Sequence, residues 1–221
     1  VDFPYVESIF PDFHSYLNDD IGVHTKRGCP LQCHFCLYNK IEGATQRYRD
    51  PQEIANEVEA LNKRYGVKKI WFTDAQFCST KKSTEHVEHI LDEMLARQVK
   101  VRWTGYLRLN YLTPEVAKKM LASGLTSIDL SFTGTQDIID SLTLGYDLEQ
   151  QMAAFRLFKD AAVEGWDKQK IKLYMPLNAP GETPDTLRAT MARIRELYEM
   201  FGRDNVLPFI FFIGVQPNTP I

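Results

Sequence analysis

The 221-residue sequence contains no long hydrophobic run, little cysteine and little net charge. No apolar stretch reaches the roughly 18–20 residues that cross a bilayer, and the longest, 207–215, is interrupted by Pro208 and Gly214. A net charge of −3 gives no reason to expect nucleic acid or an anionic membrane surface as a partner. Internal repeats, low-complexity tracts and a secretory signal pattern are also missing. We therefore expect a globular cytoplasmic protein.

The sequence has only four cysteines, and three of them, Cys29, Cys33 and Cys36, lie close together. Disulfide pairing within such a cluster would leave one cysteine over. Since no secretory pattern is present, the cluster favours a bound metal in a reducing compartment over a disulfide framework.

Short β-rich segments alternate with helical patterns along the chain. The predicted strands are Ile21–Lys26, Lys69–Asp74, Lys100–Leu107, Ser127–Phe132, Ile171–Pro176 and Leu207–Ile213. The helical patterns between them cover about 51–65, 83–98, 113–122, 136–144, 148–165 and 183–197. Several begin with a capping residue followed by proline, as in Asp50-Pro51. A helix between each pair of strands is typical of βαβ units and a parallel sheet.

Six strands and about six helices predict an α/β fold, a partial (β/α)6 TIM-like barrel over residues 21–221. A doubly wound open sheet is the alternative, because both folds need buried parallel strands and right-handed crossovers. Residues 1–20 differ in composition, with Pro4, Pro11, several aromatic residues and Asn18-Asp19-Asp20. We expect them to form an extended connector from a further N-terminal domain.

The three clustered cysteines follow the first predicted strand and precede a loop. Three thiolates in one short loop suit an iron–sulfur cluster, and a cubane of four irons on three cysteines leaves one iron open. Two alternatives compete with this interpretation. A zinc site normally shows two separated pairs of ligands, and here only His34 lies near the thiols. An electron-transfer cluster would use a fourth cysteine, which Cys78 could supply.

The spacing Cys-x3-Cys-x2-Cys, with Phe35 directly before the last cysteine, resembles the signature of the radical S-adenosylmethionine (SAM) superfamily. The runs 180–183 (Pro-Gly-Glu-Thr) and 216–220 (Gln-Pro-Asn-Thr-Pro) resemble runs that follow the fifth and sixth strands in that family. The resemblance covers residues 21–221. It implies a [4Fe–4S] cluster on the three cysteines, with SAM chelating the open iron. It further implies an electron donor such as flavodoxin or ferredoxin, and cleavage of SAM to methionine and a 5′-deoxyadenosyl radical that attacks a small-molecule or peptide substrate.

The resemblance also implies where SAM binds. Residues 73–76 (Thr-Asp-Ala-Gln) stand where many members carry a Gly-Gly-Glu run, and Arg108 and Ser131 follow or end the next two strands. The expected SAM-binding residues are Phe35, Asp74, Ala75, Gln76, Arg108, Ser131, Asn178, Gly214 and Val215. Because the carboxyl ends of parallel strands meet at one edge, we expect these residues and the cysteines around one cavity. No catalytic side chain is assigned.

Within the superfamily, the sequence most resembles the branch whose members often carry an N-terminal cobalamin-binding domain. That branch includes cobalamin-dependent methyltransferases and the anaerobic magnesium-protoporphyrin ester cyclase. The resemblance implies methyl transfer with cobalamin held outside this sequence. The alternatives are a radical SAM enzyme without cobalamin and a non-catalytic iron–sulfur electron-transfer protein.

Overall fold

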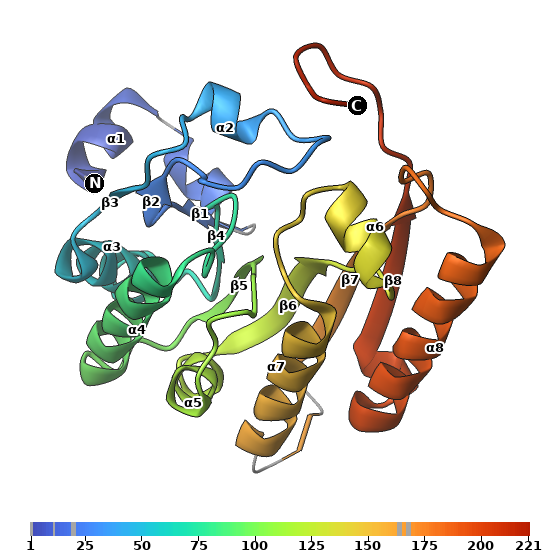
Figure 1. Ribbon diagram of the computed structural model, residues 1–221. Coiled ribbons are helices and arrows are strands. Elements are labelled where there is room, and N and C mark those ends of the chain that lie inside the picture. The colour runs from blue at the N-terminus through green and yellow to red at the C-terminus, as the bar shows by residue number, and fades with distance from the viewer. Residues whose placement is uncertain (1, 11, 19–20, 163–164, 167–168) are drawn as a thin grey trace.

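The computed structural model describes residues 2–10, 12–18, 21–162, 165–166 and 169–221. Its centre is one sheet of six parallel strands in the order β1-β4-β5-β6-β7-β8 (Figure 1). These strands are β1 (Ile21–Val23), β4 (Lys69–Phe72), β5 (Arg102–Tyr106), β6 (Leu125–Ser131), β7 (Lys170–Pro176) and β8 (Val206–Phe211). Each overlaps one predicted strand.

The order of the strands in space follows their order along the chain. A doubly wound sheet reverses its strand order at a switch point. This sheet has no reversal, so the (β/α)6 prediction is confirmed and the doubly wound alternative is wrong. In the described residues β1 and β8 do not pair with each other, and the barrel is therefore partial.

Helices cover one face of the sheet and pack against one another in chain order (Figure 1). The main helices are α3 (Pro51–Lys63), α4 (Lys81–Ala96), α5 (Pro114–Ala122), α7 (Leu148–Ala161) and α8 (Pro184–Phe201). The shorter elements are α2 (Tyr38–Ile41), α6 (Gln136–Ser141) and η2 (Arg203–Asn205). The predicted helix 148–165 is too long, because α7 ends at Ala161 and residues 162 and 165 are not helical. Residues 163–164 lie outside the described residues. Among the described helices, none is long and apolar enough to cross a membrane.

Three of the predicted capping residues begin their helices as expected. The prediction that Ser83 caps a helix through Gln98 is wrong, because Thr80 caps α4 and Ser83 lies in its first turn. The Asp50 carboxylate accepts hydrogen bonds from two backbone N–H groups of the first turn of α3, at 2.9 and 3.1 Å. Thr113 and Thr183 accept one such bond each at the starts of α5 and α8. Each capping residue is followed by proline. Proline lacks a backbone N–H, but at the first helical position that N–H would have no partner within the helix.

The strands bury alternate residues against the helices. On β4, Ile70 and Phe72 are fully buried, whereas Trp71 between them is 38% exposed on the other face. Phe72 packs against Trp103 of β5 at a ring separation of 5.4 Å. The hydrophobic core therefore lies between the sheet and the helices, and the inner face of the partial barrel is a separate surface.

Two expectations near the N-terminus are corrected. The described residues of this segment, 2–10 and 12–18, are not extended: they form α1 (Phe3–Ile9) and the 3₁₀ helix η1 (Phe13–Asn18). Pro11, Asp19 and Asp20 lie outside the described residues. The Asp2 carboxylate caps α1, and Phe3 packs on Tyr65 at 5.2 Å. Apolar burial of Phe3 thus holds the segment against α3.

The first predicted strand, Ile21–Lys26, is wrong at its end. It leaves the main sheet after Val23, and β2 (Lys26–Arg27) pairs instead with β3 (Arg47–Tyr48) in a separate antiparallel ribbon. The chain changes direction because the backbone N–H groups of Thr25 and Lys26 donate to Asp74.

Candidate active site

The three clustered cysteines lie in the loop 28–37, which joins β2 to α2. This loop has no regular structure, so hydrogen bonds to other loops fix its course. The Cys29 N–H donates to the Gly43 carbonyl at 3.0 Å. The two ring nitrogens of His34 lie 2.8 Å from the Ser141 carbonyl and 2.7 Å from the Thr143 hydroxyl. His34 thus attaches the loop to the end of α6 rather than pointing at the thiols.

Gly28 is required where the loop begins. Its φ is +89°, a region that side chains rarely adopt, and a Cβ there would collide with the Thr45 carbonyl. Only glycine therefore lets Cys29 follow β2 directly at this close approach.

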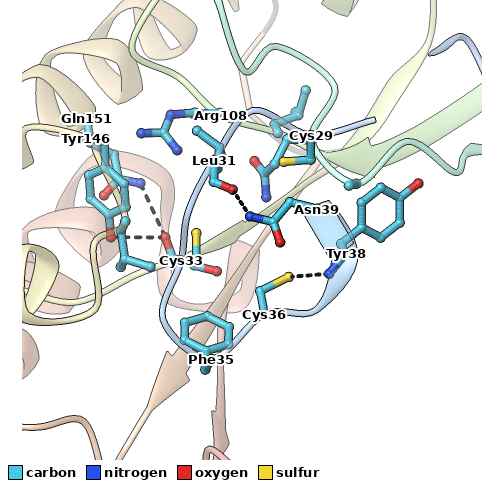
Figure 2. A pocket seen from close by; sticks show the side chains of 15 residues that line it. Cys29, Leu31, Cys33, Phe35, Cys36, Tyr38, Asn39, Arg108, Tyr146 and Gln151 are labelled. Atoms are coloured by element: carbon cyan, nitrogen blue, oxygen red, sulfur yellow. Dashed lines mark hydrogen bonds between the residues drawn. The ribbon is translucent and has the colours of Figure 1, made fainter. Parts of the chain in front are cut away.

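The three cysteines line one cavity of about 110 Å³ at the carboxyl ends of the strands (Figure 2). We call the loop residues on this cavity the cysteine wall: Cys29, Leu31, Cys33, Phe35, Cys36, Tyr38 and Asn39. Burial raises the pKa of the Cys29 thiol, and burial together with Cys36 raises the pKa of Cys33 to about 11. Without a bound cation these thiols are therefore protonated at neutral pH.

The remaining lining comes from strand ends and the loops that follow them, from the loop between α6 and α7, and from α7. We call it the scaffold wall: Ala75, Gln76, Leu107, Arg108, Ser131, Leu144, Tyr146 and Gln151. Arg108 is 7% exposed, donates to the Gly145 carbonyl and lies 5.6 Å from the centre of the Tyr146 ring. Burial lowers its pKa, which the nearby Cys33 sulfur opposes. No carboxylate of the described residues forms an ion pair with Arg108, so a buried positive charge faces the cysteines.

Gln151 was not expected at the site. Its amide N–H donates to the Ser131 carbonyl at 3.4 Å, while its buried Oε1 has no hydrogen-bond partner among the described residues. The sequence does carry a signal for it, because Gln151 interrupts the apolar stripe of Leu148, Met152 and Phe155 on α7. A buried polar residue within such a stripe indicates a partner that the helix core does not supply.

Several of the expected SAM-binding residues do line the cavity together with the three cysteines. They are Phe35, Ala75, Gln76, Arg108 and Ser131. Tyr38 also lines it. Leu31, Asn39, Leu107, Leu144 and Tyr146 belong to the lining without any motif that marks them.

Asp74 does not line the cavity and is 1% exposed. Its carboxylate accepts from the Thr25 N–H at 2.7 Å, from the Thr25 hydroxyl, and from the Lys26 ammonium at 2.9 Å. The same ammonium donates to the Gln76 carbonyl at 2.6 Å. The buried Lys26–Asp74 pair therefore ties the start of the cysteine loop to the Ala75–Gln76 loop, where sequence reasoning expected a contact with SAM.

Asn178, Gly214 and Val215 also lie outside the cavity lining. The Asn178 amide donates to the Ile213 carbonyl at 3.0 Å and accepts from its N–H at 2.6 Å, which joins the loops after β7 and β8. Val215 is 81% exposed. The expectation that all strand-end residues surround one cavity thus fails for these three and for Asp74.

The donor set fits an open iron–sulfur cluster. Among the described residues, no three His, Cys, Asp or Glu side chains converge as the ligands of a single ion do, whereas three thiols surround a cavity. The fourth cysteine, Cys78, is 1% exposed in the hydrophobic core and is not part of the lining. Three cysteines on one cavity can hold three irons of a [4Fe–4S] cubane and leave the fourth iron without a protein ligand. The polar groups of the scaffold wall lie beside the cysteines and suit a small molecule bound to that fourth iron.

The profile of the radical SAM superfamily matches residues 23–194, which is more than half of the chain. The chain belongs to the radical SAM superfamily. Membership agrees with the cysteine spacing and with the partial barrel.

Two curated relatives are similar to this radical SAM chain. Bacteriochlorophyllide d C-12(1)-methyltransferase of Chlorobaculum tepidum is 28% identical over 95% of the chain and 45% of the relative. The anaerobic magnesium-protoporphyrin IX monomethyl ester cyclase of Cereibacter sphaeroides is 28% identical over 72% of the chain and 28% of the relative. The radical SAM chain therefore spans less than half the length of these relatives.

Solved structures share the fold. The methyltransferase TsrM from Kitasatospora setae, with cobalamin and a [4Fe–4S] cluster bound, superposes with a TM-score of 0.77 at 19% identity, over 95% of the chain and 37% of TsrM. Coproporphyrinogen III oxidase HemN from Escherichia coli gives 0.61 at 14% identity, over 94% of the chain and 48% of HemN. At these identities the likeness shows the radical SAM fold alone.

Proposed function

We propose that Cys29, Cys33 and Cys36 hold a [4Fe–4S] cluster and that SAM binds its open iron and is cleaved reductively in the cavity. The observation that carries this proposal is the pairing of three thiols with a buried, uncompensated Arg108 on one cavity. When bound, the cluster supplies the electron that cleaves SAM. A donor of the flavodoxin or ferredoxin type delivers that electron.

The residues of the scaffold wall bind and orient SAM. The Arg108 guanidinium is the cation that the methionine carboxylate of SAM would meet, and a carboxylate there completes its hydrogen bonding. The unpartnered Oε1 of Gln151 accepts from an ammonium or hydroxyl donor of SAM. Phe35, Leu107 and Leu144 exclude water, which strengthens both interactions.

The residues outside the lining act through position. Asp74 holds the backbone of Ala75 and Gln76 at the cavity, and Asn178 fixes the loop before Gly214 and Val215. The N–H of Tyr38 donates to the Cys36 sulfur at 3.4 Å and tunes that ligand.

We further propose that the complete protein is a cobalamin-dependent methyltransferase of a small molecule or peptide, with residues 1–20 leading in from a cobalamin-binding domain. Three relatives of the chain carry methyltransferase names, and TsrM was solved with cobalamin bound. The partial barrel leaves its inner face open at the gap between β1 and β8, where a second domain can cover it.

The test is SAM cleavage by anaerobically prepared, reduced protein. We expect about four irons per chain, and conversion of SAM to methionine and 5′-deoxyadenosine, or to S-adenosylhomocysteine where methyl transfer dominates. An intact, reducible cluster that binds SAM and yields neither product would contradict the proposal. Binding of cobalamin is measured separately by its absorption, so the methyltransferase part can fail alone.

A further inference from the structure

The inner face of the partial barrel carries an unusual set of side chains. In closed parallel barrels, bulky aliphatic residues fill this space. Here the inward positions of the central strands are aromatic or polar, while their outward neighbours Ile128, Leu130 and Leu173 are buried aliphatic residues. The strand register places on this face of β4 to β8 the residues Trp71, Thr104, Tyr106, Ser127, Asp129, Ser131, Lys172, Tyr174, Phe209 and Phe211, together with the aliphatic Leu207 on the edge strand β8. Such a face is built for a ligand more than for a core.

Four of these residues form what we call the aromatic row: Trp71, Tyr106, Tyr174 and Phe209. Their ring centroids follow one another at 5.9, 5.8 and 5.5 Å across the sheet from β4 to β8. Both ends of the row are open, since Trp71 is 38% and Phe209 44% exposed. Within the row, Trp71–Tyr106 and Tyr106–Tyr174 meet edge to face at interplanar angles of 70° and 61°, whereas Tyr174 and Phe209 are stacked at 19°. Large aromatic side chains left this exposed in a line offer an apolar surface several rings long, made of ring edges as well as ring faces.

The polar groups beneath the row compensate one another. Asp129 pairs with Lys172 at 3.2 Å and accepts from the hydroxyls of Thr104 at 3.2 Å and Tyr174 at 3.4 Å. Burial and Asp129 raise the pKa of Tyr174 to about 12, so its ring is neutral at physiological pH. The row therefore presents neutral rings and selects a ligand by aromatic and apolar contact rather than by net charge.

The aromatic row continues into the proposed SAM cavity at two points. Tyr174 is paired in register with Ser131, which lines the cavity. Phe35 of the cysteine wall contacts Phe211, two residues beyond Phe209 on the same face of β8, at 6.4 Å. A molecule lying on the row would be placed next to the site of radical formation.

We propose that the aromatic row binds the substrate and that this substrate contains an extended planar conjugated ring system. This inference rests on the proposed function for the chemistry that follows binding. A ligand of single-ring size would contact one or two of the four rings and leave one end of the row in water. An extended ring system reaches Trp71 and Phe209 together, and an edge-to-face or stacked contact with each ring adds to the burial of apolar area.

The test is binding of protoporphyrin IX, used below its aggregation concentration, to the purified protein without SAM or reductant. We expect saturable binding, followed by quenching of protein fluorescence and by the shift of the porphyrin absorption band. Trp71→Leu and Phe209→Leu should each weaken binding about tenfold, and Trp71→Phe should keep it within about threefold. Tyr16→Leu is the matched control, because Tyr16 is 66% exposed on η1, outside the row.

Absence of saturable binding, or an equal loss in the Tyr16→Leu control, would overturn the inference and assign the row to packing against another protein segment. Because the measurement needs no turnover, its failure leaves SAM cleavage untouched. Conversely, a protein that binds the porphyrin and does not cleave SAM would retain the row as a binding site and lose the proposed function.

Discussion

The two walls of the cavity are built by different means. The cysteine wall comes from the irregular loop 28–37 and the start of α2. Its three cysteines lie within eight positions, and the course of the loop depends on hydrogen bonds to Gly43, Ser141 and Thr143. The scaffold wall is assembled from residues that end or follow β4, β5 and β6, from the loop between α6 and α7, and from α7 itself (Figures 1 and 2). The proposed metal ligands thus lie on a loop without regular structure, and the groups proposed to bind SAM lie on a wall built around strand ends and a helix.

We therefore expect substitutions in the two walls to have different effects on cluster content and on SAM binding. Damage to the cysteine wall should abolish the cluster, because three ligands are the fewest that hold it. Damage to the scaffold wall should weaken SAM binding and leave the cluster in place. The Lys26–Asp74 pair joins both, so its loss should affect the fold.

The largest effect is expected when one ligand is removed from the cysteine wall. Cys33→Ala should reduce bound iron from about four per chain to near zero and abolish SAM cleavage. Cys78→Ala is the control and should keep the iron, because Cys78 lies in the core away from the cavity. Iron and sulfide analysis of both variants measures the cluster content. Loss of the cluster in Cys78→Ala would contradict the assignment of the ligands to the cysteine wall.

The next effect concerns the joint between the walls. Lys26 and Asp74 are 3% and 1% exposed, so Lys26→Met leaves a buried carboxylate without its cation. We expect a loss of about 3–5 kcal/mol in the free energy of unfolding, measured with urea. Arg188→Met removes an ion pair whose side chains are 74% and 90% exposed and should change stability little. Equal effects of the two variants would show that the Lys26 pair does not hold the fold.

Much of the fold and of the cysteine wall follows from the sequence. Six alternating strands, the capped helices at Asp50, Thr113 and Thr183, and the three clustered cysteines are local patterns of a few residues. Arg108 and Ser131 were found because strand ends share an edge.

The rest depends on contacts that no local pattern encodes. Asp74 follows a strand as expected, but its carboxylate is used by Thr25 and Lys26, nearly fifty positions earlier. Tyr146 reaches the cavity through the loop between α6 and α7, and Phe3 orders the N-terminal segment through tertiary contacts such as that with Tyr65. Such tertiary choices override the extended tendency that proline gives an isolated segment.

A smaller effect is expected from the buried cation of the scaffold wall. Arg108→Gln should weaken SAM binding about 100-fold at unchanged iron content, because a carboxylate loses its charged, bidentate partner. Arg108→Lys should recover part of this loss, since it restores the charge without the fork geometry. Calorimetric titration with SAM gives the affinities, and binding equal to that of the unmodified protein would exclude Arg108 from the SAM site.

The smallest effect is expected at Gln151. Gln151→Leu keeps the volume and removes the Oε1 that lacks a partner, so SAM affinity should fall about fivefold. The same change should leave the melting temperature equal or higher, because a buried unsatisfied atom is gone. Unchanged affinity together with a higher melting temperature would make Gln151 a structural residue of α7.

The account rests on SAM and the cluster sharing one cavity, and electron paramagnetic resonance of the reduced protein measures this directly. We predict that adding SAM changes the g-values of the reduced cluster, and that the change requires about 100-fold more SAM in Arg108→Gln. A reduced cluster whose spectrum is the same with and without saturating SAM would contradict the account, because SAM would then bind away from the open iron.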